Sequence, residues 1–483
     1  SIQWLSNSMY PAGYFVRGIP VQASVIVPTG WKVATALRPS GETGNRVDYP
    51  VTSYEILVDS PLIAGAHYRK IPLTQDVTLD VIADTEAELA AKPEQIAAHK
   101  RLVEQAVKAF GAQHYDHYDF LLTISDSLGG NGLEHHRSSE DGVDRGYFTD
   151  WANKLRDRNL LPHEFSHSWD GKFRRPADLW TPDYRTPMQD SGLWVYEGQT
   201  QFWGYVLGAR SGMLSKQDTL DAIAATAASY SLGTPGRQWR PLIDTTNDPI
   251  IASRAAIPWR SWQRSEDYYS EGQLIWLDVD RIIRQQSRGR RSIDDFARAF
   301  FGIRDRDWGE VTYTLDDIVA TLNKVQPYDW AGYLHRRVYE VAPQAPLEGI
   351  TEGGYKLVYT AEPTKWWKSG EKEGKRTDLT YSGGFAIGND GKVQSVLWDS
   401  AAFNAGITPG DEILAVNSRH FDGDALKDAI KAADGQGPAV QLLVKSGDLY
   451  RTVSLDWHGG LRYPRLEKVG KGRGTLDALL APR

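Results

Sequence analysis

The spacing of apolar residues changes twice along the chain, and each change indicates a different kind of structure. Up to about residue 83, short runs rich in Val, Ile, Tyr and Phe are separated by Gly and Pro, which is typical of strands and turns. The strongest strand candidates run from Phe15 to Val27, from Tyr54 to Pro61 and from Val77 to Ile82. We therefore expect residues 1–83 to form an N-terminal β-rich domain.

Helical spacing dominates the middle of the chain. Apolar residues recur every three or four positions from Ile96 to Phe110 and again from Gln273 to Ile283. Thr314 followed by Asp317 predicts a capping box that opens a further helix. We expect residues 84–344 to form a mostly helical domain.

Short strands and Gly-rich turns return near the C-terminus. One helix is expected from Asp424 to Ala432, and the charged stretch from Lys368 to Arg376 is expected to be an exposed loop. The pattern suggests a third domain over residues 345–460 and a C-terminal tail over 461–483. The fold class is thus a multidomain α+β protein.

Composition excludes several classes of function. The chain has 483 residues and no cysteine, so disulfides, thiolate catalysis and cysteine-bound metals are excluded. Its net charge of −7 argues against a nucleic-acid partner. No apolar run approaches the roughly 18 residues of a membrane helix, so membrane insertion is not expected. The chain starts at Ser1, as a processed product would, and a periplasmic or secreted location is favoured over the cytoplasm. The oligomeric state leaves no trace in the sequence.

A short segment in the helical region carries the clearest chemical signal. His163 and His167 are four residues apart, so a helix would place both on one face, where neutral imidazoles can bind one zinc ion. Glu164 follows the first histidine and can take a proton from an attacking water. Pro162 fits the first turn of such a helix, with Asn159 as a possible cap. The alternative is a surface helix with two solvated histidines.

A catalytic zinc requires a third protein ligand, and Glu197 is the candidate. It lies in a segment with apolar helical character that includes Trp194, Val195, Phe202 and Trp203. A carboxylate in such surroundings is costly unless it is paired or coordinated. The alternative is that Glu197 faces solvent.

The two segments His163–His167 and Trp194–Gly198 resemble the gluzincin aminopeptidases. The closer resemblance is to the M61 glycyl aminopeptidase family, which the run from Lys172 to Ala177 also resembles. Members of this family are similar to shortened M1 aminopeptidases with a PDZ-like domain appended. The resemblance implies a thermolysin-like catalytic domain over residues 84–344 and an N-terminal domain that is shorter here than a complete one.

The resemblance also implies two substrate-contacting regions. Gly130, Asn131 and Gly132 lead into Glu134, which takes the role of the acid that binds the α-ammonium of the substrate. Without the resemblance, Glu134 reads as an ordinary turn acid. His135 and His136 are interpreted as shaping residues and not as metal ligands.

Tyr269 is similar in position to a tyrosine that stabilises the transition state in the larger aminopeptidases. The sequence departs from those enzymes at Glu271, where a lysine is usual. Tyr268 is therefore an alternative, and an ordinary core aromatic is another.

Near the C-terminus, Gly383–Ile387, Ser400–Ile407 and Pro409–Asn417 resemble a PDZ domain. Such domains bind extended peptides by adding a strand to a sheet edge. The module either docks substrate or braces the catalytic part.

Together these features predict a zinc metalloaminopeptidase that removes an N-terminal Gly or Ala from peptides with a free N-terminus, using one Zn²⁺ per chain. One alternative keeps the zinc but changes the substrate, as in an endopeptidase or an M1-like epoxide hydrolase. The other is a PDZ scaffold with an inactive peptidase domain.

Overall fold

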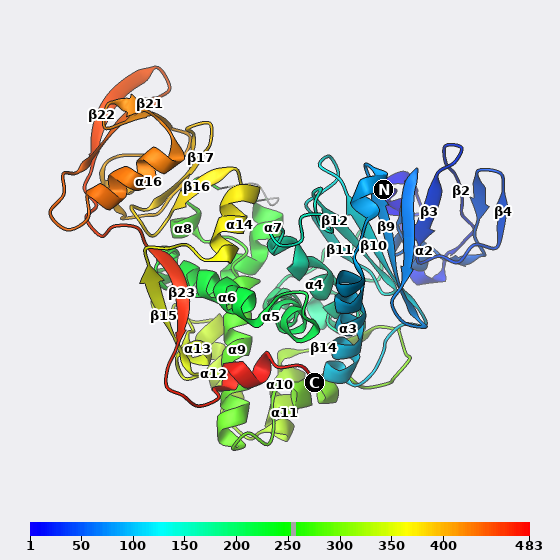
Figure 1. Cartoon of the computed structure of the whole chain (residues 1–483). Coiled ribbons are helices and arrows are strands. Elements are labelled where there is room, and N and C mark those ends of the chain that lie inside the picture. The colour runs from blue at the N-terminus through cyan, green and yellow to red at the C-terminus, as the bar shows by residue number, and fades with distance from the viewer. Residues whose placement is uncertain (253–256) are drawn as a thin grey trace. The chain divides into compact units, whose positions relative to one another are not determined.

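The computed structural model describes residues 1–252 and 257–483 (Figure 1). The chain divides into two compact units, and each unit combines segments that are distant in sequence. The first unit comprises Ser1–Lys216, Ile282–Trp330 and Leu479–Arg483, and the second comprises Gln217–Arg281 and Ala331–Ala478. Both units contain strands and helices, so the protein is of the expected mixed α+β class.

The first unit combines many short strands with a few longer helices. Its strands are β1 (Pro20–Val21), β2 (Ser24–Ile26), β3 (Lys32–Thr35), β4 (Gly41–Thr43), β5 (Arg46–Asp48), β6 (Thr52–Ser53), β7 (Leu62–Gly65), β8 (His67–Pro72), β9 (Val77–Ala83), β10 (Tyr118–Ile124), β11 (Asn131–Glu134), β12 (Ser138–Val143), β13 (Arg174–Pro176) and β14 (Val311–Tyr313). Its helices are α1 (Trp4–Asn7), α2 (Tyr54–Val58), α3 (Pro93–Phe110), α4 (Leu160–Ser166), α5 (Leu193–Ser211), α10 (Ile293–Phe300) and α11 (Leu315–Val325).

A five-stranded sheet with the order β11-β12-β10-β9-β8 lies beside α4 (Figure 1). The central strand β10 runs parallel to β9 and β12, and nearly all of its side chains are buried. The strand expected at Val77–Ile82 is thus confirmed as β9. At the edge, β11 pairs antiparallel with β12 and is hydrogen-bonded to no other strand among the described residues.

One expected strand of the N-terminal region is a helix instead. The segment from Tyr54 to Val58 forms α2, because Ser53 caps it: the Ser53 hydroxyl accepts a hydrogen bond from the Ile56 amide at 3.2 Å. Tyr54, Leu57 and Val58 are buried, so one face of this short helix packs into the N-terminal core. In so short a run, the spacing of apolar residues fits both a strand and a helix, and the hydrogen bond from the capping serine favours the helix.

The helices expected in the middle of the chain are present. α3 covers Pro93–Phe110 and buries the predicted apolar face. α11 starts at the predicted capping box, in which the Thr314 amide and hydroxyl both donate to the Asp317 carboxylate, at 2.8 and 3.1 Å. No helix in the described part of the chain has the length and hydrophobicity needed to cross a bilayer.

The second unit contains most of the remaining elements. Its helices are α6 (Lys216–Ser231), α7 (Asp248–Ile251), α8 (Arg260–Gln263), α9 (Ser270–Gln286), α12 (Trp330–Val338), α13 (Glu348–Thr351), α14 (Lys365–Glu373), α15 (Ala401–Asn404), α16 (Gly423–Ala432) and α17 (Thr475–Leu479), of which α6, α9, α12 and α17 extend into segments of the first unit. Its strands are β15 (Tyr355–Thr360), β16 (Arg376–Leu379), β17 (Phe385–Gly388), β18 (Val393–Val396), β19 (Glu412–Val416), β20 (Arg419–His420), β21 (Val440–Ser446), β22 (Leu449–Leu455) and β23 (Tyr463–Lys468).

The charged stretch from Lys368 to Arg376 is not the exposed loop that its composition suggests. Most of it belongs to α14, which Thr364 caps by accepting a hydrogen bond from the Trp367 amide at 3.2 Å. Trp366 and Trp367 are buried and hold the helix against the core, while the lysines and glutamates lie mainly on its outer face. The expected helix near Asp424 is confirmed as α16.

Candidate metal centre and active site

The helix that carries His163, and whose C-terminal cap is His167, is short and begins where the sequence indicates. α4 starts at Leu160, so Pro162 lies in its first turn, where a missing amide hydrogen costs nothing. The expected cap is wrong in one respect: Asn159 occupies the cap position, but its side chain accepts no hydrogen bond from the helix. The helix starts directly from the preceding turn of 3₁₀-helix, Arg156–Asn159.

The structure brings His163, His167 and Glu197 together. The two Nε2 atoms lie 3.2 Å apart, and Glu197 Oε2 lies 3.5 Å from His163 Nε2 and 3.4 Å from His167 Nε2. All three residues are buried. Burial opposes ionisation of Glu197, but the imidazoles of His167 and His163 outweigh it and hold the pKa of this carboxyl well below its usual value.

Glu197 reaches this point because α5 packs closely against α4 (Figure 1). The close approach occurs at Gly204, where a Cβ atom would lie 2.7 Å from Asn159 Oδ1 and 3.3 Å from the Cβ of His163. Any larger residue at position 204 would push the two helices apart. α5 is buried on almost every side, which explains its nearly continuous run of apolar and small residues.

The three side chains fit a zinc ion. Ligand atoms on a tetrahedral zinc with bonds of about 2.0–2.1 Å lie about 3.4 Å apart, close to the separations found here. His167 Nδ1 lies 3.0 Å from the Asp170 carbonyl oxygen and donates to it, so Nε2 of the neutral ring offers a lone pair. Glu197 Oε2 is buried and accepts no hydrogen bond from any described residue. A cation between these atoms would satisfy them all.

Glu164 lies beside the proposed metal position. One of its carboxylate oxygens lies within 4.8 Å of ring nitrogens of both His163 and His167, which is close enough for Glu164 to contact a metal ion held by the two histidines or a water on that ion. Gly132 allows the carboxylate this place, since a Cβ there would lie 2.3 Å from Glu164 Oε1. Burial, followed by the charges of Glu134, Asp141 and Glu197, raises the pKa of Glu164 well above its usual value.

Glu134 ends the edge strand β11, so its side chain lies at the rim of the sheet next to this centre. Its carboxylate accepts a hydrogen bond from the Tyr196 hydroxyl and has no ion pair with any described basic side chain. Burial disfavours its charge, but His167 and Lys172 outweigh that and hold the pKa of Glu134 below its usual value. Of the other predicted substrate residues, Gly130 has a φ of +75° and forms the turn, and Asn131 and Gly132 are exposed on β11.

Tyr196 is a site residue that the sequence did not single out. It precedes Glu197 on α5, and its ring packs over Gly171, where a Cβ would lie 2.4 Å from the Tyr196 Cζ. Glycine is needed at position 171 for two reasons: its φ of +117° disfavours other residues, and a side chain would clash with the ring. Tyr196 lies in the segment Trp194–Gly198, but only the fold shows that its hydroxyl reaches Glu134.

His135 and His136 are held away from the metal centre, as expected of shaping residues. Both bind the Asp59 carboxylate, through His135 Nδ1 at 3.3 Å and His136 Nδ1 at 3.1 Å. Lys172 completes this cluster with an ion pair to Asp59 at 3.0 Å. Burial opposes ionisation of Asp59, but Lys172 and the two histidines outweigh it and keep the pKa of this carboxyl well below its usual value.

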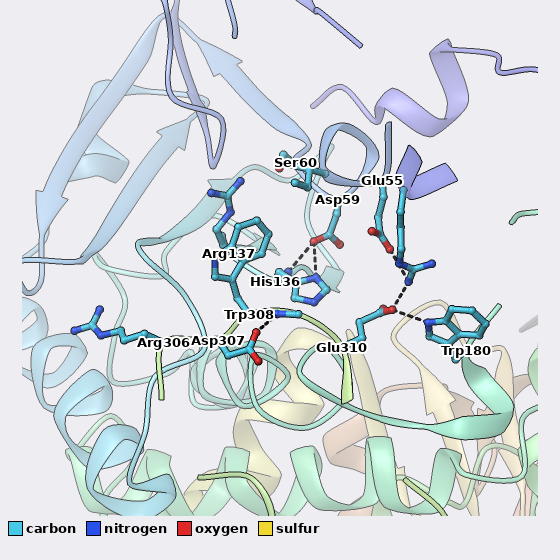
Figure 2. Close-up of a pocket in the computed structure, with 13 residues that line it drawn as sticks. Glu55, Asp59, Ser60, His136, Arg137, Trp180, Arg306, Asp307, Trp308 and Glu310 are labelled. Atoms are coloured by element: carbon cyan, nitrogen blue, oxygen red, sulfur yellow. Dashed lines mark hydrogen bonds and ion pairs between the residues drawn. The ribbon is translucent and has the colours of Figure 1, made fainter. Parts of the chain in front are cut away.

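A cavity of about 470 Å³ opens next to Glu134. Figure 2 shows the neighbouring cavity, of about 570 Å³, which shares part of its wall with the first. In the shared wall, the Glu310 carboxylate binds Arg17 and accepts a hydrogen bond from the Trp180 indole at 2.8 Å, while Asp59 binds His136 (Figure 2). A peptide-sized ligand therefore has room beside Glu134, while His163, Glu164, His167 and Glu197 are not among the residues that line these two cavities.

Tyr269 lies in the second unit, immediately before α9. It stacks on Tyr268 with ring centroids 4.8 Å apart, and it is partly exposed whereas Tyr268 is fully buried. Exposure favours Tyr269 of the two as a residue that can touch substrate.

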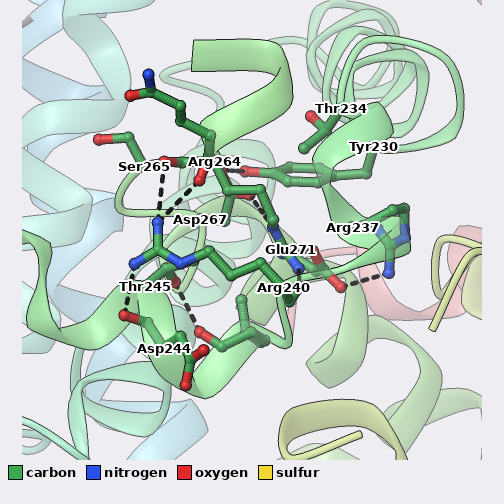
Figure 3. Close-up of polar contacts among 12 residues, drawn as sticks. Tyr230, Thr234, Arg237, Arg240, Asp244, Thr245, Arg264, Ser265, Asp267 and Glu271 are labelled. Atoms are coloured by element: carbon green, nitrogen blue, oxygen red, sulfur yellow. Dashed lines mark hydrogen bonds and ion pairs between the residues drawn. The ribbon is translucent and has the colours of Figure 1, made fainter. Parts of the chain in front are cut away.

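The unusual Glu271 has a structural explanation. Its two carboxylate oxygens bind Arg237 at 2.7 Å and Arg264 at 2.5 Å, and Arg264 also binds Asp267 at 2.7 Å (Figure 3). All four charged side chains are buried. A lysine at position 271 would bring a third cation against two guanidinium groups, so this network accounts for the acid.

Two family models match the chain: M61 glycyl aminopeptidase over residues 156–275, and the peptidase M61 N-terminal domain over residues 1–66. The resemblance inferred from the motif residues is thereby confirmed, and it supports a peptidase. No curated protein matches the chain significantly in sequence.

Among solved structures, an aminopeptidase N family protein from Idiomarina loihiensis is similar over 96% of this chain and 80% of that one, with 18% identity and a TM-score of 0.75. At this identity the likeness shows the fold alone. A yeast LTA4 hydrolase is 14% identical, over 66% of this chain and 46% of that one, with a TM-score of 0.43. An M1 zinc metallopeptidase from Deinococcus radiodurans is 15% identical, over 68% and 65% of the two chains, with a TM-score of 0.42.

Proposed function

Because two separate parts of the chain match the M61 peptidase family, we propose that this protein is a zinc aminopeptidase. His163, His167 and Glu197 bind the metal. The observation that carries the proposal is the triangle of their ligand atoms, with sides of 3.2, 3.5 and 3.4 Å, buried next to an unpaired acid at the rim of a cavity.

Glu134 selects peptides by their N-terminus. Among the described residues its carboxylate has no cationic partner, and a charge-assisted hydrogen bond to a substrate α-ammonium would supply one. The free edge of β11 leads up to it and offers backbone groups to an extended peptide. A peptide anchored there presents its first carbonyl to the metal centre.

Glu164 carries the proton. Its carboxylate takes a proton from the attacking water and gives it to the leaving amine, a role worth about 10²–10⁴ in rate. Zinc, when bound, supplies a Lewis acid that polarises the scissile carbonyl and makes water a better nucleophile. Tyr269 donates a hydrogen bond to the oxygen on which negative charge develops, as the resemblance implies.

The decisive variant is Glu164→Gln, which preserves shape and removes the base. We expect the purified, zinc-loaded variant to lose at least about 100-fold in kcat on alanyl and glycyl amides. Hydrolysis at the wild-type rate would show that Glu164 is not the base. Comparing glycyl, alanyl and leucyl amides then tests the proposed preference for a small first residue.

Acetylation of the substrate separates an aminopeptidase from an endopeptidase. A peptide with a blocked N-terminus cannot bind Glu134 as a cation, so we expect its hydrolysis to stop. Equal hydrolysis of the free and acetylated peptides would favour an endopeptidase.

We propose that the PDZ-like module over residues 345–460 braces the enzyme and does not dock substrate at β17. In this part of the chain, β17 follows Gly383 and Gly384 and is paired on one side with β18 and on the other with β16. An added strand would find no free edge on β17. Binding of a peptide C-terminus to this module, seen as NMR shifts confined to β17, would contradict this view.

A further inference from the structure

The cavity beside Glu134 is lined by eight acidic or basic side chains other than histidines. They are Arg17, Glu55, Asp59, Glu134, Lys172, Arg175, Asp183 and Glu310. Five of them form ion pairs with one another: Arg17 pairs with Glu55 and Glu310, and Lys172 pairs with Asp59. Asp183 is held by its own turn, where it accepts hydrogen bonds from the amides of Arg185 and Thr186.

Apart from Asp183, whose carboxylate is held by those backbone amides, two of the charges lack an opposite partner among the described residues. Glu134 is the anion, bonded only by the neutral Tyr196 hydroxyl. Arg175 is the cation, with no carboxylate within 4 Å among the side chains that the structure describes. One unpaired charge of each sign in a single cavity is the complement of a zwitterion.

The contacts of Arg175 fix its orientation and leave part of its guanidinium available. Nε donates to the Leu179 carbonyl at 3.3 Å and Nη1 to the Gly171 carbonyl at 3.2 Å. Among the described residues, Nη2 has a polar contact only with the sulfur of Met188, at 4.0 Å, and Met188 is 44% exposed. The remaining N–H groups of Nη1 and Nη2 form the two-pronged face with which arginine binds carboxylates.

Arg175 and Glu134 both contact the side chain of Tyr196. The Arg175 Cζ is 5.8 Å from the centre of the Tyr196 ring, and the hydroxyl of that ring donates to Glu134. These two contacts limit the separation of the two charges to on the order of 10 Å or less. A peptide advances about 3.3–3.6 Å per residue, so after a hydrogen bond at each end only one or two residues fit between them.

From this we propose that Arg175 binds a substrate carboxylate that lies within the first two residues of the peptide whose α-ammonium is held by Glu134. The preferred substrates are then short zwitterionic peptides. The carboxylate is either the C-terminus of a dipeptide or an acidic side chain at the start of a longer peptide. This inference rests on the proposed aminopeptidase function.

The test compares peptides that differ only in this carboxylate. One arm uses Ala-Ala and its C-terminal amide, and the other uses Ala-Glu amide and Ala-Gln amide. We expect wild-type protein to favour the acid over its neutral counterpart by about 10-fold or more in kcat/KM in at least one arm. The arm that shows the preference tells whether Arg175 binds the C-terminal carboxylate or the acidic side chain. In Arg175→Gln this ratio should fall at least about 10-fold, towards one. A wild-type ratio near one in both arms, or a ratio that Arg175→Gln leaves unchanged, overturns the proposal.

A matched control and a binding measurement make the result specific. Arg185→Gln removes an exposed guanidinium from the neighbouring loop, outside the cavity lining, and should leave the ratio unchanged. If the neutral amides are hydrolysed but the acids are not preferred, this proposal fails and the aminopeptidase function stands. If nothing is hydrolysed, the proposed aminopeptidase function fails. Calorimetry then compares the affinity of the protein for Ala-Ala and for its amide, which tests carboxylate binding by Arg175 without catalysis. Equal affinities overturn the proposal for Arg175.

Discussion

Replacing Glu271 by glutamine should destabilise the segment around α9 far more than a single surface charge would. The carboxylate of Glu271 binds both Arg237 and Arg264, and all three side chains are at least 96% buried. Glutamine keeps the shape of the side chain but removes its charge. Of the two buried guanidinium groups, Arg264 then keeps the carboxylate of Asp267, and Arg237 keeps no carboxylate among the described residues. Breaking a buried pair in this way costs about 3–5 kcal/mol.

Hydrogen exchange followed by mass spectrometry can read this cost locally, which avoids treating a two-unit chain as a two-state folder. In peptides covering residues 257–281, a loss of about 3 kcal/mol corresponds to exchange at least about 100-fold faster. The matched control is Glu352→Gln, which breaks the ion pair with Arg281 at 2.7 Å. Glu352 is 52% exposed, so this change should cost at most about 1 kcal/mol. Equal effects of the two variants would refute the idea that the buried network explains Glu271.

Three further predictions concern the first unit. Burial lowers the pKa of His99 to about 4 from 6.5, so the folded state loses stability as pH falls from 6.5 towards 4, by about 2 kcal/mol at pH 5. Hydrogen exchange in peptides covering α3 should show this loss as a difference in local unfolding free energy between pH 7.5 and pH 5. His99→Gln should reduce that difference by about 2 kcal/mol, and an unchanged difference would exclude His99 as its source. Tyr196→Phe removes the hydroxyl that orients Glu134 and should raise KM for peptide amides about 5- to 10-fold with one zinc still bound; loss of the zinc instead would assign the tyrosine to the metal site. Gly171→Ala places a methyl group 2.4 Å from the Tyr196 ring at a φ of +117°. We expect it to lower kcat/KM for peptide amides by at least the factor found for Tyr196→Phe. Wild-type kinetics would show that the position of the ring is not critical.

The sequence predicts the helices and the metal motif well because their signals are local. The i and i+4 histidines, the capping box at Thr314 and the apolar face of α3 each depend on residues within a few positions of one another. Such patterns survive folding, since the helix geometry that produces them is the same in every context.

Other features depend on contacts between distant segments. Tyr54–Val58 is short enough to fit a strand or a helix, and a single capping serine decides. The lysines and glutamates of α14 read as a loop until two buried tryptophans on the opposite face are taken into account. Local composition therefore failed where amphipathic packing, and not polarity, determines the structure.

The cavity residues show the same limit more strongly. Arg175 and Glu134 are 41 positions apart, and only the fold shows that both contact the side chain of one tyrosine. Nor does the sequence show that the other charges of this wall are already paired. Which charge is left over in a cavity is a property of the assembled side chains and cannot be inferred from their order.

The most direct test of the metal assignment is the zinc content of the protein and of its Glu197→Gln variant, measured by mass spectrometry after dialysis against a weak chelator. Three buried ligands with sides of 3.2–3.5 Å predict about one zinc per wild-type chain, and loss of the carboxylate should weaken binding at least about 100-fold, leaving the variant nearly free of zinc. A wild-type chain without zinc, or a variant that retains it fully, would contradict the proposed centre.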